Sequence, residues 1–487
     1  MTPTNPSLRH PRQLYLLFFT EMWERFSFYG MKALLLAYMV TQLKFDEPKS
    51  YAILGSYAAL AYTMPIFGGM LADRILGYRK AVLFGGILMS LGHFILAVPI
   101  NESFFFGMAF IICGNGFFKP NISSLVGTLY EENDKRKDSA FSIFYMGINL
   151  GAMLGGVLCG YLGEQVNWHW GFGLAGVFMI LGLVNFLYGQ KKLGNRGLPP
   201  AKSISIKWFP RVKPERLIYI ATFLAVPVVV LLFYAYKAMD WVMLGLGLLS
   251  LAYIIYTASK LEVTARFKLF AAITMIVSSL LFWAFYNQYS GSLNLFAIRN
   301  VNMHVAGIDL PPLSVNNFLP PFWVITLSPV FAWLWLRLNK KGWEPGTAMK
   351  FVLSFLFVAL GFFVLYLGCT ASTNGFVSLA VFVVFYFTII CGELCLSPIG
   401  LSMITKLSPA NIVGMMMGIW FLATAIGEFL AGKIGSLMSV PTGISQPTET
   451  LPYYSAILKN IAIGSLAIAV VLLLLVPLLK RWMKDVK

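Results

Sequence analysis

The sequence predicts an all-α integral membrane protein with about fourteen transmembrane helices, and three observations point to this fold class. Of the 487 residues, 58% are hydrophobic and 12% are charged, with a mean hydropathy of +0.74. Apolar runs of about 20 residues, the length at which an α-helix crosses a bilayer, recur along the whole chain. The weak ten-residue alternation typical of a transmembrane β-barrel is not seen.

Each predicted span is one of these apolar runs, and polar segments separate consecutive spans. In chain order the spans are 14–43, 51–71, 79–98, 103–128, 139–161, 170–190, 217–236, 241–259, 268–297, 318–337, 349–370, 377–405, 411–438 and 456–479.

Basic residues gather in alternate loops, which predicts the orientation of the chain. By the positive-inside rule these loops face the cytoplasm, and an even number of spans returns the chain to the side where it starts. Both termini are therefore expected to be cytoplasmic. The net charge of +17 reflects these loops, so no nucleic-acid partner is expected. The basic loops lie around 9–12, 74–80, 135–137, 191–216, 260–268, 337–350 and 480–487.

The longest polar stretch, 191–216, contains Pro, Gly and many basic residues and is interpreted as a cytoplasmic linker. Six spans precede it and eight follow. The predicted organisation is a six-helix bundle at 1–190, the linker at 191–216, two additional helices at 217–260 and a second six-helix bundle at 261–487. We expect the additional helices to act as scaffold, because they lack charged residues near the bilayer centre.

Six helices in each half, together with GGMLADRILGYRK at 68–80, resemble the major facilitator superfamily and its loop between helices two and three. In that loop the Asp73 carboxylate would cap the turn or pair with basic residues across it. The resemblance implies a gating or folding role for Asp73, without substrate contact. Gly69 and Gly77 would let neighbouring helices approach closely.

The first predicted span carries an unusual charged stripe in the segment EMWERFSFYGMK. At roughly 2.5 to 3.5 kcal/mol for each charge near the bilayer centre, four charges facing lipid would cost on the order of 10 kcal/mol. The stripe must therefore line a wet cavity or pair with other helices, or else it is an ion-paired face that only holds helices together. Its charged members fall on one helix face: Glu21, Glu24, Arg25 and Lys32.

Two further charges are isolated in apolar helices that Gly or Pro interrupts: Lys119 in the first half and Glu393 in the second. Broken backbone inside a membrane lines a cavity, and each buried charge predicts a partner. Opposite signs in opposite halves predict a site at the interface of the two bundles.

These motifs resemble the proton-coupled oligopeptide transporters, the POT or PTR family. The segment Glu21-x-x-Glu-Arg-Phe-x-Phe-Tyr-Gly is similar to that family's first-helix signature, and FSIFYMGINLGAMLGG to its fifth helix. Lys119 before Pro120, SLNLFAIRN from Ser292, Glu393 and Trp420 fall in family order. The late segments LPPFWVI and PTETLPYY look most like bacterial dipeptide and tripeptide permeases.

The resemblance implies a symporter that imports dipeptides and tripeptides with protons across the bacterial inner membrane by alternating access, working as a monomer. Glu21, Glu24 and Arg25 would couple protons. Arg25 and Lys119 would bind the peptide carboxylate, and Glu393 with Asn149 the amine. Other peptide contacts would be Tyr29, Tyr62, Trp283, Asn287, Asn317 and Trp420. Gating would involve Lys32, Lys119, Glu393 and Asp73.

The sequence also departs from the family pattern. Asn287 stands where the family commonly has the acid that pairs with Lys32, so another group must serve at that gate. Glu428 has two interpretations, a buried pair with Lys433 or an additional proton site. Pro320 replaces the family's Asn and leaves Asn317 as the candidate contact. The histidines are interpreted as lying at helix ends or loops and as unlikely proton carriers: His10, His93, His169 and His304.

Other functions fit the residues less well. Some relatives import nitrate, but Glu393 would repel a simple anion, and drug efflux remains the other alternative. No HExxH, GxSxG or paired His and Cys cluster indicates an enzyme or a metal site, and no cofactor is expected. The cysteines lie in apolar segments and are interpreted as buried hydrophobic residues: Cys113, Cys159, Cys369, Cys391 and Cys395.

Overall fold

The computed structural model describes residues 9–131, 134, 136–200, 213–409 and 412–483, and most of them are helical. Residues 201–212 of the predicted linker lie outside the described residues, as do Lys135, Lys484 and Lys487 of the basic loops. The chain forms two compact units. The first contains 1–31 and 63–231, and the second contains 32–62 and 232–487.

Two long helices at the start of the chain, α1 (Arg12–Thr41) and α2 (Glu47–Leu71), contribute residues to both units. In the first unit, α3 packs against α4 and α6. The other elements of this unit are η1 (Ala72–Leu76), α3 (Tyr78–Ala97), α4 (Ser103–Gly127), α5 (Lys137–Tyr161), η2 (Leu162–Val166), α6 (Trp168–Gly189), η3 (Gln190–Leu193) and all but the last three residues of α7 (Pro214–Tyr234).

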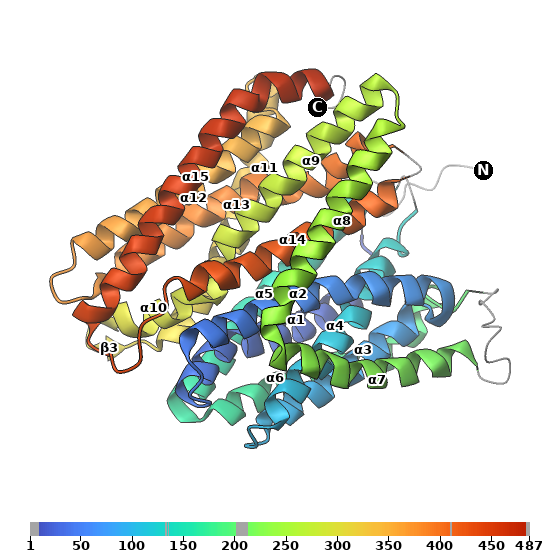
Figure 1. Cartoon of the computed structure of the whole chain (residues 1–487). Coiled ribbons are helices and arrows are strands. Elements are labelled where there is room, and N and C mark those ends of the chain that lie inside the picture. The colour runs from blue at the N-terminus through green and yellow to red at the C-terminus, as the bar shows by residue number, and fades with distance from the viewer. Residues whose placement is uncertain (1–8, 132–133, 135, 201–212, 410–411, 484–487) are drawn as a thin grey trace. The chain divides into compact units, whose positions relative to one another are not determined.

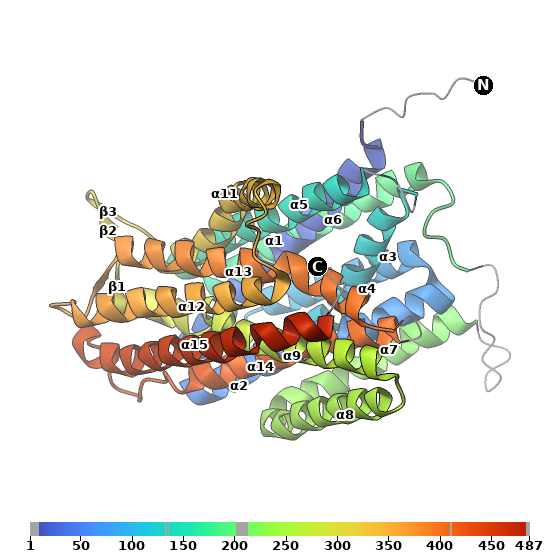
Figure 2. The same ribbon diagram turned by 90° about the horizontal axis from the view of Figure 1, so that it is seen from above.

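In the second unit, α12 lies side by side with α13 and α15 (Figure 1), and α9 packs against α12, α14 and α15 (Figure 2). Its helices are η4 (Tyr236–Ala238), α8 (Met239–Ser259), α9 (Val263–Tyr286), η5 (Asn287–Ser290), α10 (Ser292–Asn300), α11 (Pro312–Lys340), α12 (Thr347–Thr370), α13 (Leu379–Leu407), α14 (Val413–Ser436) and α15 (Pro447–Met483).

Four strands of two residues each lie between helices of the second unit. None of these strands was predicted. The strands β1 (Val301–Asn302) and β4 (Val377–Ser378) pair in parallel. The strands β2 (His304–Val305) and β3 (Ile308–Asp309) pair antiparallel across a short turn. Runs this short carry no periodicity from which a strand can be predicted.

Among the described residues, twelve helical segments are long and apolar enough to cross a membrane. The helices α1 and α4 are also long, with 30 and 25 residues, and they carry the charged stripe and Lys119. Including these two gives the predicted number of about fourteen, and the prediction of an all-α membrane protein is confirmed. The division into 1–190, 191–216, 217–260 and 261–487 stays a prediction.

The predicted span 268–297 lies within the candidate membrane span Val263–Asn300, but the helix is not continuous across it. The helix α9 ends at Tyr286, a 3₁₀ turn covers Asn287–Ser290, and α10 begins after Gly291. Gly291 takes φ −118° and ψ −106°, a conformation that interrupts regular helix geometry. The break places Asn287 in the turn between the two helices.

Candidate functional site

Small residues fix the position of α1, the helix with the charged stripe, against α5. A Cβ atom added to Gly151 would lie 2.2 Å from the carbonyl oxygen of Met22, and one added to Gly155 would lie 2.2 Å from that of Phe26. Only glycine permits this backbone approach. The glycines of FSIFYMGINLGAMLGG therefore allow α5 to pack directly on α1.

The stripe forms a compact ion cluster inside the first unit. Glu21, Glu24 and Arg25 are at most 1% exposed. Arg25 Nη2 donates to Glu24 Oε1 at 2.6 Å, and its Nε donates to Glu24 Oε2. The same Nε lies 3.2 Å from Glu21 Oε1. One guanidinium thus pairs with two buried carboxylates of the same helix, so this part of the stripe is ion-paired within α1.

The two acids are not equivalent in this cluster. Both oxygens of Glu24 contact Arg25. Glu21 contacts Arg25 through Oε1 alone, and its buried Oε2 has no hydrogen-bond partner among the described residues. An unpartnered buried carboxylate oxygen is costly. Arg25 is therefore held more completely by Glu24 than by Glu21.

Two residues of α4 complete the cluster. Arg25 Nη2 also donates to Asn115 Oδ1 at 3.3 Å. Lys119, which is partly buried, lies close enough for its charge to act on both glutamates. Sequence reasoning predicted Lys119 but missed Asn115. The available signal was an amide between two glycines in an otherwise apolar helix.

Aromatic rings lie beside the same arginine. The Arg25 guanidinium carbon is 5.2 Å from the centre of the Phe28 ring and 5.9 Å from that of the Tyr29 ring. Both distances are within the range of cation–π attraction. Tyr29 is half-buried, and its ring lies beside the guanidinium.

Three further candidate residues come from the N-terminal half of the chain. Asn149 is half-buried, and its amide donates to the carbonyl of Tyr145 one turn earlier. Asp73 is exposed in η1, and no ion pair with it is found in the described part of the chain. Tyr62, at the end of the second unit's share of α2, is half-buried.

In the second unit, Glu393 lies on α13 and is 7% exposed. Tyr286, the last residue of α9, donates its hydroxyl to Glu393 Oε2 at 2.5 Å. A hydrogen bond this short is typical of a hydroxyl bonded to a carboxylate. This hydroxyl was not predicted from the sequence.

Two candidate tryptophans lie in the same unit as Glu393. The Trp283 ring lies 5.3 Å from the Tyr286 ring in an edge-to-face arrangement and is half-buried. Trp420 is 7% exposed and packs against α13, where a Cβ atom added to Gly400 would lie 2.2 Å from its ring. Trp420 is thus largely enclosed by protein, while Trp283 is more accessible.

Asn317 is part of a buried amide network. Its Nδ2 donates to Asn294 Oδ1 at 3.0 Å, and Asn316 Nδ2 donates to the same oxygen at 2.6 Å. Tyr386 donates its hydroxyl to Asn316 Oδ1. Satisfied networks of this kind fix the packing of the helices that carry them, here α10, α11 and α13. A peptide contact of Asn317 stays a prediction.

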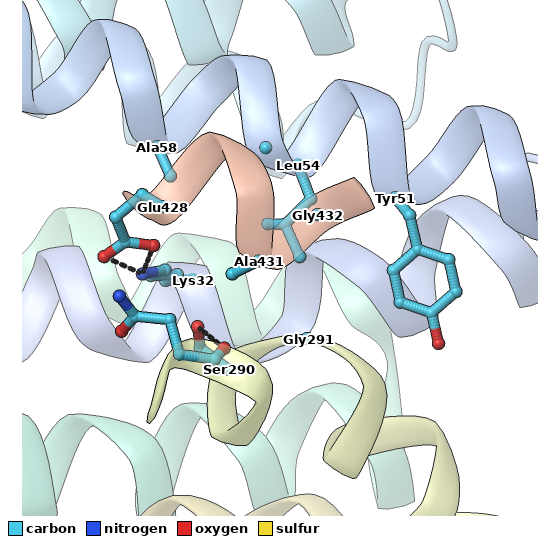
Figure 3. A pocket seen from close by; sticks show the side chains of 11 residues that line it. Lys32, Tyr51, Leu54, Ala58, Ser290, Gly291, Glu428, Ala431 and Gly432 are labelled. Carbon is cyan, nitrogen blue, oxygen red and sulfur yellow. Dashed lines mark hydrogen bonds and ion pairs between the residues drawn. The ribbon is translucent and has the colours of Figure 1, made fainter. Parts of the chain in front are cut away.

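The interpretation of Glu428 as a partner of Lys433 is wrong. Lys433 pairs with Asp240 of α8 at 2.6 Å. Glu428 instead forms an ion pair with Lys32, whose Nζ lies 3.3 Å from each carboxylate oxygen (Figure 3). Lys32 and Glu428 belong to the same unit, Lys32 in its segment 32–62 and Glu428 in its segment 232–487. They are far apart in sequence, and no spacing rule joins them. This pair explains how Lys32 is compensated although Asn287 is not an acid.

Two further expectations concern histidine and cysteine. His10, His169 and His304 lie at or near element ends, but His93 lies within α3 and is fully buried. All five cysteines are free and buried. The described part of the chain contains no group of three or more His, Cys, Asp or Glu side chains arranged to hold a metal ion.

Comparison with known proteins agrees with this arrangement. A family model described as the POT family matches residues 79–451. The uncharacterized transporter YclF of Bacillus subtilis is 38% identical over 98% of this chain and 96% of its own. Dipeptide and tripeptide permease A of Cronobacter turicensis is 34% identical over 99% of this chain and 95% of its own.

A solved structure extends the likeness to the whole fold. A mutant peptide transporter, described as POT and crystallised in complex with alafosfalin, is 37% identical. The match covers 99% of this chain and 98% of the other, with a TM-score of 0.85. The expected fold of the major facilitator superfamily is thereby confirmed. A family match over most of the chain, together with full-length relatives above 30% identity, establishes that this protein belongs to the POT family.

Proposed function

We propose that the protein imports dipeptides and tripeptides together with protons. The observation that carries the proposal is the cluster in which Arg25 is held by two buried acids. An arginine that these acids release can bind a peptide carboxylate. The acids release it when they take up a proton. Full-length relatives named as dipeptide and tripeptide permeases support the same substrate.

A peptide needs a cation at one end and an anion at the other. We assign its carboxylate to Arg25 and Lys119. We assign its amine to Glu393, with Asn149 as a further polar contact. Glu393 is compensated in the structure by a hydroxyl and by no cation that forms an ion pair with it among the described residues, so an ammonium group would find its charge available. The other assigned contacts are Tyr29, Tyr62, Trp283, Asn287, Asn317 and Trp420.

Proton coupling follows from competition for Arg25. While Glu24 is charged, it occupies both Nε and Nη2 of the guanidinium. Protonation of Glu21 or Glu24 removes one negative charge from the cluster and frees the arginine for the peptide carboxylate. Release of peptide inward lets the acids recover Arg25 and lose the proton. For each charge moved inward, the membrane supplies about 2.3 kcal/mol per 100 mV.

The remaining features of the proposal are topological. We place the protein in the bacterial inner membrane with both termini in the cytoplasm, because the basic loops alternate along the chain. We place the gating groups at Lys32, Lys119, Glu393 and Asp73, and treat a single chain as the transporting unit, without enzymatic activity. Import of nitrate and efflux of drugs are not favoured, because the characterised relatives above are named for peptides.

Uptake of labelled dialanine into proteoliposomes tests the function. We expect accumulation only when protein, an inward proton gradient and an inside-negative potential are all present, and unlabelled trialanine should compete. Lack of gradient-dependent uptake by correctly folded protein would contradict the proposal. The matched control is the same preparation with the gradient collapsed by a protonophore.

A further inference from the structure

The pair of Lys32 and Glu428 lines a small cavity in the second unit. The cavity measures about 10 Å³, which is about the room that one water molecule requires. Its walls come from α1, α2, α14 and the turn between α9 and α10. Figure 3 shows Lys32 reaching across this space to Glu428.

The pair is thoroughly removed from solvent. Both side chains are 4% exposed. Asn287 lines the same cavity, is 5% exposed and has an Nδ2 atom without a hydrogen-bond partner among the described residues. The position where an acid is expected from the family pattern therefore faces the pair, but it offers an amide. Glu428 is the acid that this cavity contains.

The other ionisable groups around the pair are engaged elsewhere. Tyr51, the third titratable residue of the cavity wall, directs its ring away from the pair (Figure 3). On α8, Asp240 pairs with Lys433 of α14. On α13, Glu393 accepts from Tyr286 of α9. The charge on Lys32 therefore depends on Glu428 for its compensation.

From this geometry we propose that Glu428 is a second proton-carrying acid of the transport cycle and that its pair with Lys32 is a proton-sensitive lock. The inference rests on the proposed function. When a proton from outside binds to a Glu428 oxygen, Lys32 remains a buried ammonium without a counter-ion, which is unstable. The lock opens, and it closes again when Glu428 releases the proton inward. Each cycle moves one proton by this route.

The lock is joined to the peptide site by a single helix. Lys32 and Arg25 lie on α1, which is continuous from Arg12 to Thr41, and seven residues of an α-helix span about 10 Å. The proton on Glu428 and the peptide on Arg25 act on the same structural element.

The test compares two transport modes of the full-length protein in proteoliposomes. One is accumulation of dialanine driven by a 100 mV inside-negative potential without a pH difference. The other is exchange of dialanine between both sides without any gradient. Glu428→Gln should keep exchange within about twofold of the parent, because Gln mimics the protonated acid. It should lose the driving force of one proton, which is on the order of 50-fold in accumulation at this potential.

Two further variants separate a coupling role from a structural one. Asn287→Asp combined with Glu428→Gln returns an acid to the same cavity and should restore accumulation. Lys433→Gln breaks a half-exposed ion pair on the same helix and should accumulate dialanine like the parent. Recovery in the double variant supports the proposal even if Glu428→Gln alone folds poorly.

Parent-like accumulation by Glu428→Gln would overturn the inference, as would loss of both transport modes in the single and double variants. Failure of the proposed function is recognised separately, because the parent itself would then show no potential-driven uptake of dialanine.

Discussion

Replacement of Glu393 by Gln probes the recognition of the peptide amine. The carboxylate is 7% exposed and accepts one hydrogen bond, from Tyr286 at 2.5 Å. Gln keeps the size of the side chain and the acceptor for Tyr286, but it removes the negative charge. The variant should therefore fold like the parent and lose attraction for an ammonium group.

The size of the effect follows from the burial of the site. A hydrogen bond that involves a charged group contributes about 1.5 to 3 kcal/mol. This range corresponds to a loss of roughly 10- to 150-fold in apparent affinity for dialanine. Because Glu393 is shielded from solvent, screening by salt should reduce the loss only slightly.

The assay compares dialanine with N-acetyl-dialanine as competitors of labelled peptide uptake. The parent should prefer the free amine by about the same factor, and Glu393→Gln should abolish that preference. Tyr286→Phe is the matched variant, since it removes the neighbouring hydroxyl and retains the charge, so it should keep the preference. A Glu393→Gln protein that still discriminates between the two competitors as the parent does would refute the assignment.

The remaining predictions concern coupling, packing and pH. Glu24→Gln should weaken the dependence of dialanine uptake on the proton gradient, because Arg25 then loses the partner that holds both Nε and Nη2; full pH-driven uptake would contradict this. Gly151→Ala should destabilise the protein by about 1 to 3 kcal/mol, since its Cβ would lie 2.2 Å from a backbone oxygen. Gly245→Ala, which has no neighbour within 4 Å, is its control in thermal unfolding followed by tryptophan fluorescence. In the loop before α12, the hydrogen bond from Lys350 at 2.6 Å lowers the pKa of Glu344 below its ordinary value of 4.5. A lowered carboxyl pKa stabilises the folded protein above that value and ceases to do so as pH falls through the shifted pKa. Glu344→Gln should therefore lower the unfolding temperature at pH 7, and the difference from the parent should shrink below about pH 4.5; a difference independent of pH would count against the pair.

The helices could be predicted from sequence because a membrane span depends on local composition. The predicted spans 79–98 and 349–370 differ from α3 and α12 by one or two residues at the ends. The break at Asn287–Ser290 was not predicted, although the polar run from Asn287 to Ser292 interrupts the apolar pattern there. Its interruption depends on hydrogen bonds and on Gly291, which periodicity does not report.

The site residues can also be divided into those that local sequence predicts and those that depend on tertiary packing. Glu21, Glu24 and Arg25 could be predicted as a cluster because they are neighbours on one helix face. The partner of Lys32 could not, because Glu428 is 396 residues away in sequence and Lys433 offered a nearer cation. The hydrogen bond of Tyr286 to Glu393 could not be predicted either, because it requires the packing of α9 on α13.

The coupled movement of peptide and proton is the central claim, and a direct measurement of proton flux tests it. Proteoliposomes that contain the protein and a trapped pH indicator would receive dialanine outside, with the potential clamped inside-negative. The account predicts acidification of the interior that begins with peptide addition, needs the protein and is reduced in Glu24→Gln. Entry of labelled dialanine without any acidification would contradict it.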